Sequence, residues 1–255
     1  MNGTPSSPPA LPPNNRVILI TGAGGAIGSA TAIALAAQGV SVVLLGRTLP
    51  PLEKTYDAII AAGHPKPAIC PLDFASATAT EFHNVAKLIQ DEFGRLDGIV
   101  HAAASIGSLT PIEHYDLPLW SRVLQINLTA PMLLTRACLE LLKASGSAAI
   151  LFSTSEVGHR GQAYWGAYGV AQAAIENLVE TLADELAENT AIRVNSIDPG
   201  PIRSRLRALA FPGEDPNSLP EAATVIPVYL HLMSSAQDNI TGSRIQATKH
   251  SRYSA

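Results

Sequence analysis

Short apolar runs alternate along this chain with longer segments in which apolar residues recur at helical spacing. Strands that are buried on both faces of a parallel sheet are nearly continuous apolar runs, and the segments between them form crossover helices. The pattern therefore predicts a parallel sheet covered by helices. The predicted strands are Val17–Ile20, Val40–Leu45, Ala68–Cys70, Leu96–Ala102, Ala148–Phe152, Ile192–Ile197 and a last one near Ile240–Ile245.

The segments between these strands have the period of amphipathic helices, most clearly after Tyr168. The second helix is expected to start only after Pro50 and Pro51, because proline breaks a helix interior. The expected helices run from the first strand to about Gln38, over Leu52–Ala62, over Ala75–Phe93, between the fourth and fifth strands, and over Tyr168–Glu188.

Right-handed crossovers restrict the topology of such a chain. They predict an α/β fold of the Rossmann type, a doubly wound parallel sheet with helices on both faces and its ligand at the carboxyl ends of the strands. A chain of 255 residues with 47% hydrophobic residues suffices for one full core. Residues 1–15 are rich in proline and serine and lack the apolar segment of a signal peptide. We expect a disordered leader over residues 1–15 and a single domain over residues 16–250.

Charge and composition argue against several functional classes. A formal net charge of -4 gives no basic footprint for nucleic acid, and no apolar run is long enough to cross a bilayer. The two cysteines, Cys70 and Cys138, match no metal or redox spacing, and the histidines form no metal motif. We expect a cytoplasmic protein with no metal and with neither nucleic acid nor membrane as a partner.

A glycine-rich turn, Thr21-Gly-Ala-Gly-Gly-Ala-Ile-Gly28, follows the first predicted strand and opens the first helix. A pyrophosphate bound there needs backbone N–H groups, a helix N-terminus and no obstructing side chain. Glycines suit the turn, leave the phosphate side open and let the helix pack against the sheet. This position favours dinucleotide binding over a simple loop. The expected cofactor contacts are Gly22, Gly24, Gly25, Ile27 and Gly28.

The turn resembles the TGxxxGxG motif of the classical short-chain dehydrogenase/reductase family, with Ala26 in place of the middle glycine. The resemblance covers about residues 16–245. Three later segments are most similar to the bacterial YciK-like oxidoreductases: Gly166-Ala-Tyr168, Arg193-Val-Asn195 and the stretch over residues 211–216. The resemblance implies an oxidoreductase that transfers hydride between a nicotinamide dinucleotide and a small carbonyl or alcohol substrate.

Members of this family pair two long helices across a dimer interface, often within a tetramer. The matching segments are Trp120–Leu142 and Tyr168–Glu188, so the resemblance implies a homodimer or homotetramer.

The chain has no acidic residue after the second strand to bind the ribose hydroxyls of NAD. Gly46 and Arg47 stand there instead, and a guanidinium is well suited to a 2′-phosphate. We therefore expect NADP(H) in preference to NAD(H). The alternative is that Arg47 only lies at the edge of the sheet.

Further cofactor contacts come from the resemblance. Asp73 and Phe74 match the adenine pocket, although Asp73 is also a common helix cap. The turn after the sixth strand, with Pro199, Gly200 and Ile202, matches the segment that holds the nicotinamide carboxamide. The stretch from His101 to Ala104 lacks the family's asparagine and glycine, so weaker polar support for the central sheet is expected.

The reacting residues also follow from the resemblance. Tyr168 is the expected acid or base, Ser155 the donor to the substrate oxygen, and Asn127 the residue that holds a proton-relay water. Ser155 lies thirteen residues before Tyr168, as in the family. Its neighbours Ser153 and Thr154 are alternatives for that role.

Gln172 stands where the family has a lysine. One turn after Tyr168, it can reach a nicotinamide ribose hydroxyl but supplies no charge. A cation about 4 Å from a phenolate contributes about 4 kcal/mol at an effective dielectric constant of 20, or roughly three pKa units. Without it Tyr168 should be a poor base, so reduction should survive better than oxidation. The alternative function is an inactive dinucleotide-binding sensor or partner protein.

The segment after Ile202, to about Leu219, is the expected substrate lid. Its arginines, Arg203, Arg205 and Arg207, either bind an anionic substrate or form a solvated helix face. Arg160 and Arg203 are the candidates to replace the missing lysine charge. Trp165 either lines the substrate pocket or packs in the core.

Overall fold

The structure is a computed structural model that describes residues 16–234 and 240–249. Within these residues a seven-stranded parallel sheet has the order β3-β2-β1-β4-β5-β6-β7, so the chain winds outward from β1 and again from β4. The expected leader over residues 1–15 lies outside the described residues. The strands are β1 (Val17–Thr21), β2 (Ser41–Gly46), β3 (Ala68–Pro71), β4 (Gly98–His101), β5 (Ala148–Ser153), β6 (Ile192–Asp198) and β7 (Arg244–Gln246).

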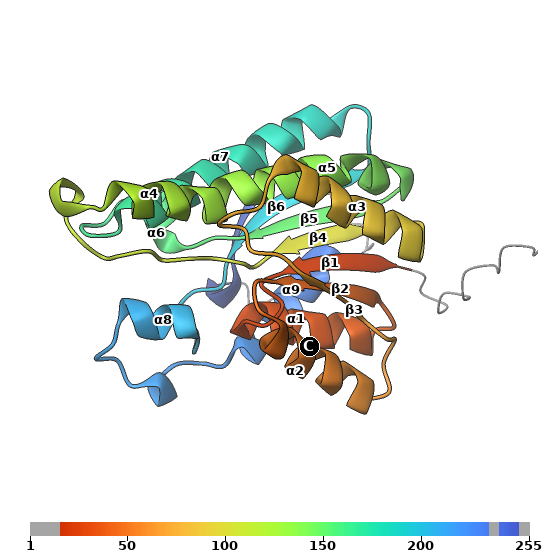
Figure 1. Cartoon of the computed structure of the whole chain (residues 1–255), viewed down its shortest axis with the longest axis horizontal. Helices are drawn as coiled ribbons and strands as arrows, with labels where there is room; N and C mark the ends of the chain where they lie inside the picture. Colours follow the sequence, from red (N-terminus) through yellow and green to blue (C-terminus); the bar gives the residue numbers. More distant parts are fainter. Residues whose placement is uncertain (1–15, 235–239, 250–255) are drawn as a thin grey trace, which may run out of the picture.

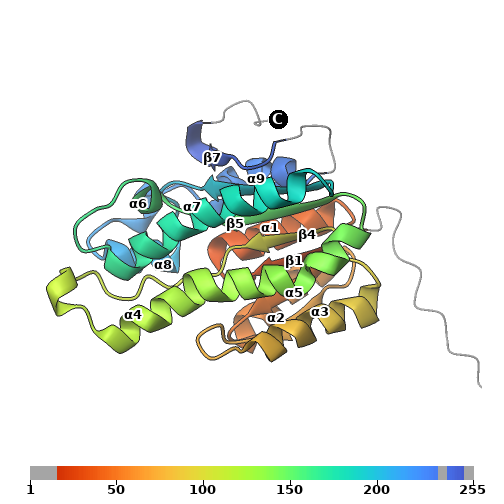
Figure 2. The same ribbon diagram turned by 90° about the horizontal axis from the view of Figure 1, so that it is seen from above.

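Helices cover both faces of the sheet (Figures 1 and 2). One layer contains α1 (Ala26–Ala37), α2 (Leu49–Ala61) and α9 (Ile226–Met233), and the other contains α3 (Ala79–Phe93), α4 (Leu117–Leu124), α5 (Ala130–Ala144) and α7 (Gly166–Ala187). Two short helices, α6 (Glu156–His159) and α8 (Arg205–Ala210), both lie at the same end of the molecule (Figure 1). The 3-10 turns are η1 (Ile112–His114), η3 (Pro216–Ser218), η4 (Ala222–Thr224) and η5 (Ala247–Lys249).

Each face of the sheet has its own hydrophobic core. Alternate strand residues point to opposite faces, so Leu19 and Ile150 pack with the α3, α5 and α7 layer, whereas Ile18 and Leu151 pack with α1, α2 and α9. The doubly wound Rossmann-type fold expected from the apolar runs is thereby confirmed. None of the helices in the described ranges has both the length and the apolar composition needed to cross a membrane.

Several predicted boundaries were wrong. Helix α2 begins at Leu49, and the two prolines lie in its first turn. Backbone N–H groups in the first turn have no partner within the helix, so a proline there costs no helical hydrogen bond. Helix α3 begins at Ala79 rather than at Ala75, because Glu81 Oε2 accepts from Thr78 N at 2.8 Å and fixes the start.

The helix expected between the fourth and fifth strands is interrupted. A π-helical segment, η2 (Gln125–Thr129), joins α4 to α5 and contains Asn127. π-helical segments are rare in proteins, and those that occur are often found at functional sites. Helix α9 was not predicted from the sequence, since eight residues give too few turns for a clear period.

Candidate active site

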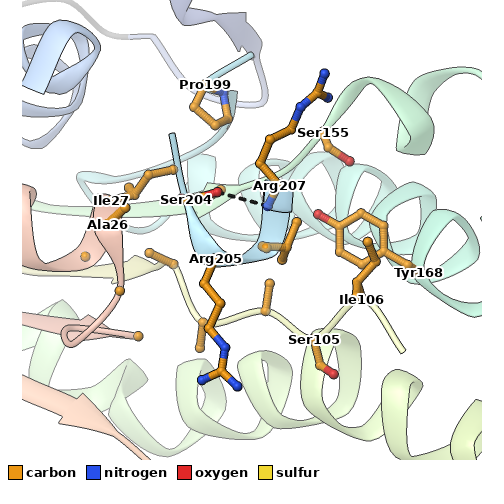
Figure 3. A pocket seen from close by; sticks show the side chains of 18 of the residues that line it. Ala26, Ile27, Ser105, Ile106, Ser155, Tyr168, Pro199, Ser204, Arg205 and Arg207 are labelled. Carbon is orange, nitrogen blue, oxygen red and sulfur yellow. Dashed lines mark hydrogen bonds between the residues drawn. The ribbon is translucent and has the colours of Figure 1, made fainter. Parts of the chain in front are cut away.

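A cleft of about 1070 Å³ lies at the carboxyl ends of the strands, beside the point between β1 and β4 where the direction of winding changes. It exceeds the volume of typical sites for small ligands, about 300–1,000 Å³, so a dinucleotide and a small substrate fit together. Figure 3 shows several of the side chains that line it. All the expected cofactor contacts line it: Gly22, Gly24, Gly25, Ile27, Gly28, Arg47, Asp73, Phe74, Pro199, Gly200 and Ile202.

The glycine turn is shaped by close approach of the backbone. Gly22 has a φ of 65°, and a Cβ there would lie 2.7 Å from Ala102 O. A Cβ on Gly28 would collide with Gly22 O. At Gly25 the side toward the cleft is open, since a Cβ would meet only Gly22 O, at 3.2 Å. The exposed turn and the N-terminus of α1 behind it suit a pyrophosphate.

Gly24 lies against α2 as well as against the cleft. A Cβ there would lie 2.5 Å from Pro51 Cβ, so this glycine allows α2 to pack against the turn as well as lining the cleft.

The loop after β4 is well supported, contrary to the expectation from the changed His101–Ala104 stretch. Thr21 Oγ1 accepts from Ala102 N at 3.1 Å and from Ala103 N at 3.2 Å. His101 itself is buried, stacks on Phe152 with ring centroids 4.4 Å apart, and has a pKa lowered to about 3 by burial. The support comes from a hydroxyl on β1, which only the folded sheet brings next to β4.

At the adenosine end, Arg47 is exposed, lines the cleft and makes no ion pair with any described residue. Asp73 also lines the cleft, and its Oδ1 accepts from Ala75 N at 3.0 Å. Asp73 therefore lines the cleft and closes a turn, and it does not cap a helix, because the N-cap of α3 is Thr78. Phe74 is buried and packs edge-to-face on Phe82.

At the opposite end, the hydroxyls of Ser155 and Tyr168 point into the cleft (Figure 3). Ser155 Oγ is buried and has no hydrogen-bond partner of good geometry among the described residues. The alternative Ser153 is engaged elsewhere, because its Oγ lies 3.0 Å from the hydroxyl of Tyr229. Thr154 Oγ1 is buried without a partner in the described part of the chain. The orientation of Ser155 toward Tyr168 favours Ser155 as the polar partner.

The pKa of Tyr168 is raised above its usual value, chiefly by burial and additionally by the charge of Asp198, while the Ser155 hydroxyl lowers it in part. The phenol therefore holds its proton at neutral pH.

Asn127 and Gln172 are both buried and stand behind the lining of the cleft rather than in it. The amide of Asn127 bridges to Ser105, accepting from its N–H at 2.8 Å and donating to its carbonyl at 2.7 Å. Asn127 thus ties the π-helical segment to the loop after β4. Gln172 Oε1 has no hydrogen-bond partner in the described residues.

No arginine weighed as a substitute for the missing lysine lies in the lining of the cleft. Arg203 Nη1 is 3.3 Å from Glu221 Oε1, and Arg160 is likewise not a lining residue. Arg244, on β7, is surrounded by carboxylates at 3.4–3.7 Å. Neither Arg160 nor Arg203 therefore supplies a cation to the lining of the cleft.

The turn after β6 shapes the cleft beside Tyr168. Gly200 has a φ of 72°, and its N–H donates to Asp198 Oδ1 at 2.9 Å. Ile202 is buried, and Ser204 starts α8 by accepting from Arg207 N at 3.1 Å. This turn leads into α8, which lines the cleft and lies within the segment expected to be the substrate lid.

Trp165 was expected either to line the substrate pocket or to pack against other side chains, and it does both. It lines the cleft and packs on Tyr168, with ring centroids 5.8 Å apart. Sequence reasoning missed other lining residues because no motif marks them: Ile106, Glu156 and Gln162. Ser204, Leu209 and Phe211 also line the cleft and fall within the segment expected to be the substrate lid. No group of three His, Cys, Asp or Glu side chains in the described ranges is arranged to hold a metal ion.

The chain is similar in sequence and structure to several known proteins. Residues 16–215 match the family model for short chain dehydrogenases. The oxidoreductase YciK of Escherichia coli K12 is 37% identical over 234 residues, which cover 92% of each chain. A short chain dehydrogenase from Salmonella enterica serovar Typhi has a TM-score of 0.88 and 39% identity, over 91% of this chain and 96% of that one. A protein of Escherichia coli CFT073 solved with NADPH has a TM-score of 0.86 and 37% identity, over 91% and 96%.

Proposed function

Because the chain belongs to the short-chain dehydrogenase family of oxidoreductases, we propose that it is an NADP(H)-dependent carbonyl reductase or alcohol dehydrogenase. The observation that carries this proposal is the convergence of the Ser155 and Tyr168 hydroxyls at one end of a cleft whose other end is a glycine turn. When bound, the nicotinamide supplies or accepts the hydride.

The preference for NADP(H) rests on Arg47. Its guanidinium is exposed in the cleft beside the end of β2, without a carboxylate to accept from the ribose of NAD. The relative from Escherichia coli CFT073 was solved with NADPH. Asp73 and Phe74 would flank the adenine, and Pro199, Gly200 and Ile202 would hold the carboxamide.

In the direction of reduction, Ser155 donates to the carbonyl oxygen of the substrate and Tyr168 transfers its proton to that oxygen. Burial and the charge of Asp198 keep Tyr168 protonated, so the proton that reduction needs is present at neutral pH. Oxidation needs the deprotonated phenol, and the neutral Gln172 gives that phenolate no stabilisation. We therefore propose a reductase whose reverse reaction is weak, with Asn127 positioning the loop after β4.

The first experiment is a calorimetric titration of the protein with NADPH and, in parallel, with NADH. NADPH should bind more tightly, and Arg47→Ala should weaken NADPH binding by about tenfold or more while changing NADH binding little. Arg203→Ala is the matched control, because Arg203 lies outside the lining of the cleft and pairs with Glu221. Equal affinity for both dinucleotides, or no binding of either, would contradict the proposed cofactor.

A second candidate function is a dinucleotide-binding protein without turnover. It is supported by Gln172, whose buried, uncharged side chain stands at the family's lysine position. Gln172→Lys distinguishes the two functions, because a site that is otherwise intact should gain carbonyl reduction. If NADPH binds but neither protein reduces any member of a broad carbonyl panel, the non-catalytic function is the correct one.

A further inference from the structure

The cleft ends at Tyr168 in a wall of aromatic and aliphatic side chains. The ring of Trp165 lies between Tyr168 and Phe211, with a centroid distance of 5.9 Å to the ring of Phe211. Phe211 is 38% exposed and Leu209 is 60% exposed, and both line the cleft. Large apolar side chains that stay exposed inside a cleft indicate that an apolar ligand covers them.

The positive charge nearest this wall is already compensated. Arg207 forms a bidentate ion pair with Glu214, Nε to Oε2 at 2.6 Å and Nη2 to Oε1 at 2.7 Å. Its guanidinium carbon lies 3.7 Å from the centroid of the Phe211 ring. Arg207 therefore packs against the aromatic wall, and Glu214 neutralises its charge, so Arg207 does not attract an anionic substrate.

Arg205 is the other arginine of the expected lid that lines the cleft, and it points elsewhere. Figure 3 shows the side chains of Arg205 and Arg207 leaving α8 in opposite directions, with Arg205 directed away from the hydroxyl of Tyr168. The anionic substrate weighed for these arginines thus lacks a cation beside the reacting hydroxyl.

Negative charge is present at this end of the cleft instead. Glu156 and Asp198 both line it, and the side chain of Glu156 is 53% exposed. They share Arg244 with a third carboxylate, Glu176, so that three acidic groups surround a single guanidinium. An anionic substrate next to them would be repelled.

From this wall and this charge we propose that the substrate is an uncharged carbonyl compound with a ring or another flat apolar group, which stacks against Trp165 and Phe211. The inference rests on the proposed function. In the reaction the carbonyl carbon gains a hydride from the reduced nicotinamide, the carbonyl oxygen gains the Tyr168 proton, and the ketone becomes an alcohol as the dinucleotide is oxidised.

The test measures binding, so it does not depend on turnover. The full chain, saturated with NADP⁺, is titrated calorimetrically with 2-tetralone, with a carboxylated tetralone and with acetone. NADP⁺ has no hydride to give, so the ketones are not consumed. We expect 2-tetralone to bind about tenfold more tightly than either of the other two compounds.

Substitutions in the aromatic wall test whether the wall causes the tighter binding of 2-tetralone. Phe211→Ala and Trp165→Ala should each weaken 2-tetralone binding by about tenfold. Phe211 is partly exposed, so its removal leaves the core in place even if Trp165→Ala disturbs Tyr168. Tyr164→Ala is the matched control, since Tyr164 is 58% exposed and does not line the cleft. Glu156→Gln should raise the affinity for the carboxylated ketone.

The inference is overturned if the carboxylated ketone binds as tightly as 2-tetralone, or if neither aromatic variant changes 2-tetralone binding. Repeating the titration without cofactor keeps this test valid should NADP⁺ fail to bind. If 2-tetralone binds as expected but NADPH does not reduce it, the proposed reductase activity fails while the preference of the cleft stands.

Discussion

Among single residues, Tyr168 and Gln172 decide the chemistry together. Tyr168 is buried, and its pKa is raised by that burial and by Asp198. Gln172 lies one helical turn away and contributes a dipole in place of a cation. A tyrosine in this setting carries the proton that reduction needs at neutral pH, whereas the phenolate that oxidation needs has no stabilising cation from Gln172.

The expected pH dependence follows from the sign of this shift. Since the pKa of Tyr168 is raised above about 10, the acid form dominates at every lower pH, and kcat/KM for reduction should stay level from about pH 6 to 9. Oxidation needs the rare phenolate, so its kcat/KM should rise roughly tenfold per pH unit over that range. Rate profiles in both directions, with Tyr168→Phe as control, check this. A loss of reduction with a midpoint near neutral pH would contradict it.

Among the elements, the first turn of α1 carries the strictest geometric demand. Gly28 packs so closely on the turn that a Cβ at this position would collide with Gly22 O. Ala26, the departure from the family motif, is by contrast exposed at the first position of α1. The same helix N-terminus thus contains one position that requires glycine and one that tolerates a methyl group.

Two matched substitutions test this difference. Gly28→Ala should lower the free energy of unfolding by about 2 kcal/mol or more and abolish NADPH binding, because the turn must shift. Ala26→Gly should cost less than about 1 kcal/mol, the difference in helix propensity, and should leave NADPH affinity unchanged or slightly higher. Urea unfolding and calorimetry measure both effects. Wild-type NADPH binding by Gly28→Ala would show that the turn is more compliant than its geometry indicates.

For the whole molecule, the layer of α5 and α7 retains apolar side chains at its surface. Leu133, Leu141, Leu178 and Leu182 are only partly buried, and Val170 is 50% exposed. Two long helices with such faces suit a four-helix contact between two copies of the chain.

We therefore predict a homodimer or homotetramer. Light scattering at micromolar concentration should give a mass of two or four times the 26.7 kDa of one chain. Val170→Glu, which places a charge on the exposed face of α7, should shift the equilibrium toward the monomer. Ile60→Glu, which places the same charge at an exposed apolar position of α2 in the opposite layer, is the matched control. A monomeric wild-type protein at these concentrations would contradict the prediction.

The sequence by itself determined the doubly wound sheet, the glycine turn and the identity of the groups around Tyr168. Buried parallel strands must be apolar throughout, and the turn must be rich in glycine, so both leave a local pattern. Tertiary structure alone decided that Thr21 supports the loop after β4, that Ser153 is engaged by Tyr229, and that Trp165 and Phe211 form one wall. These contacts join segments far apart in the chain, and their energies depend on packing and burial, which no local spacing of residues records.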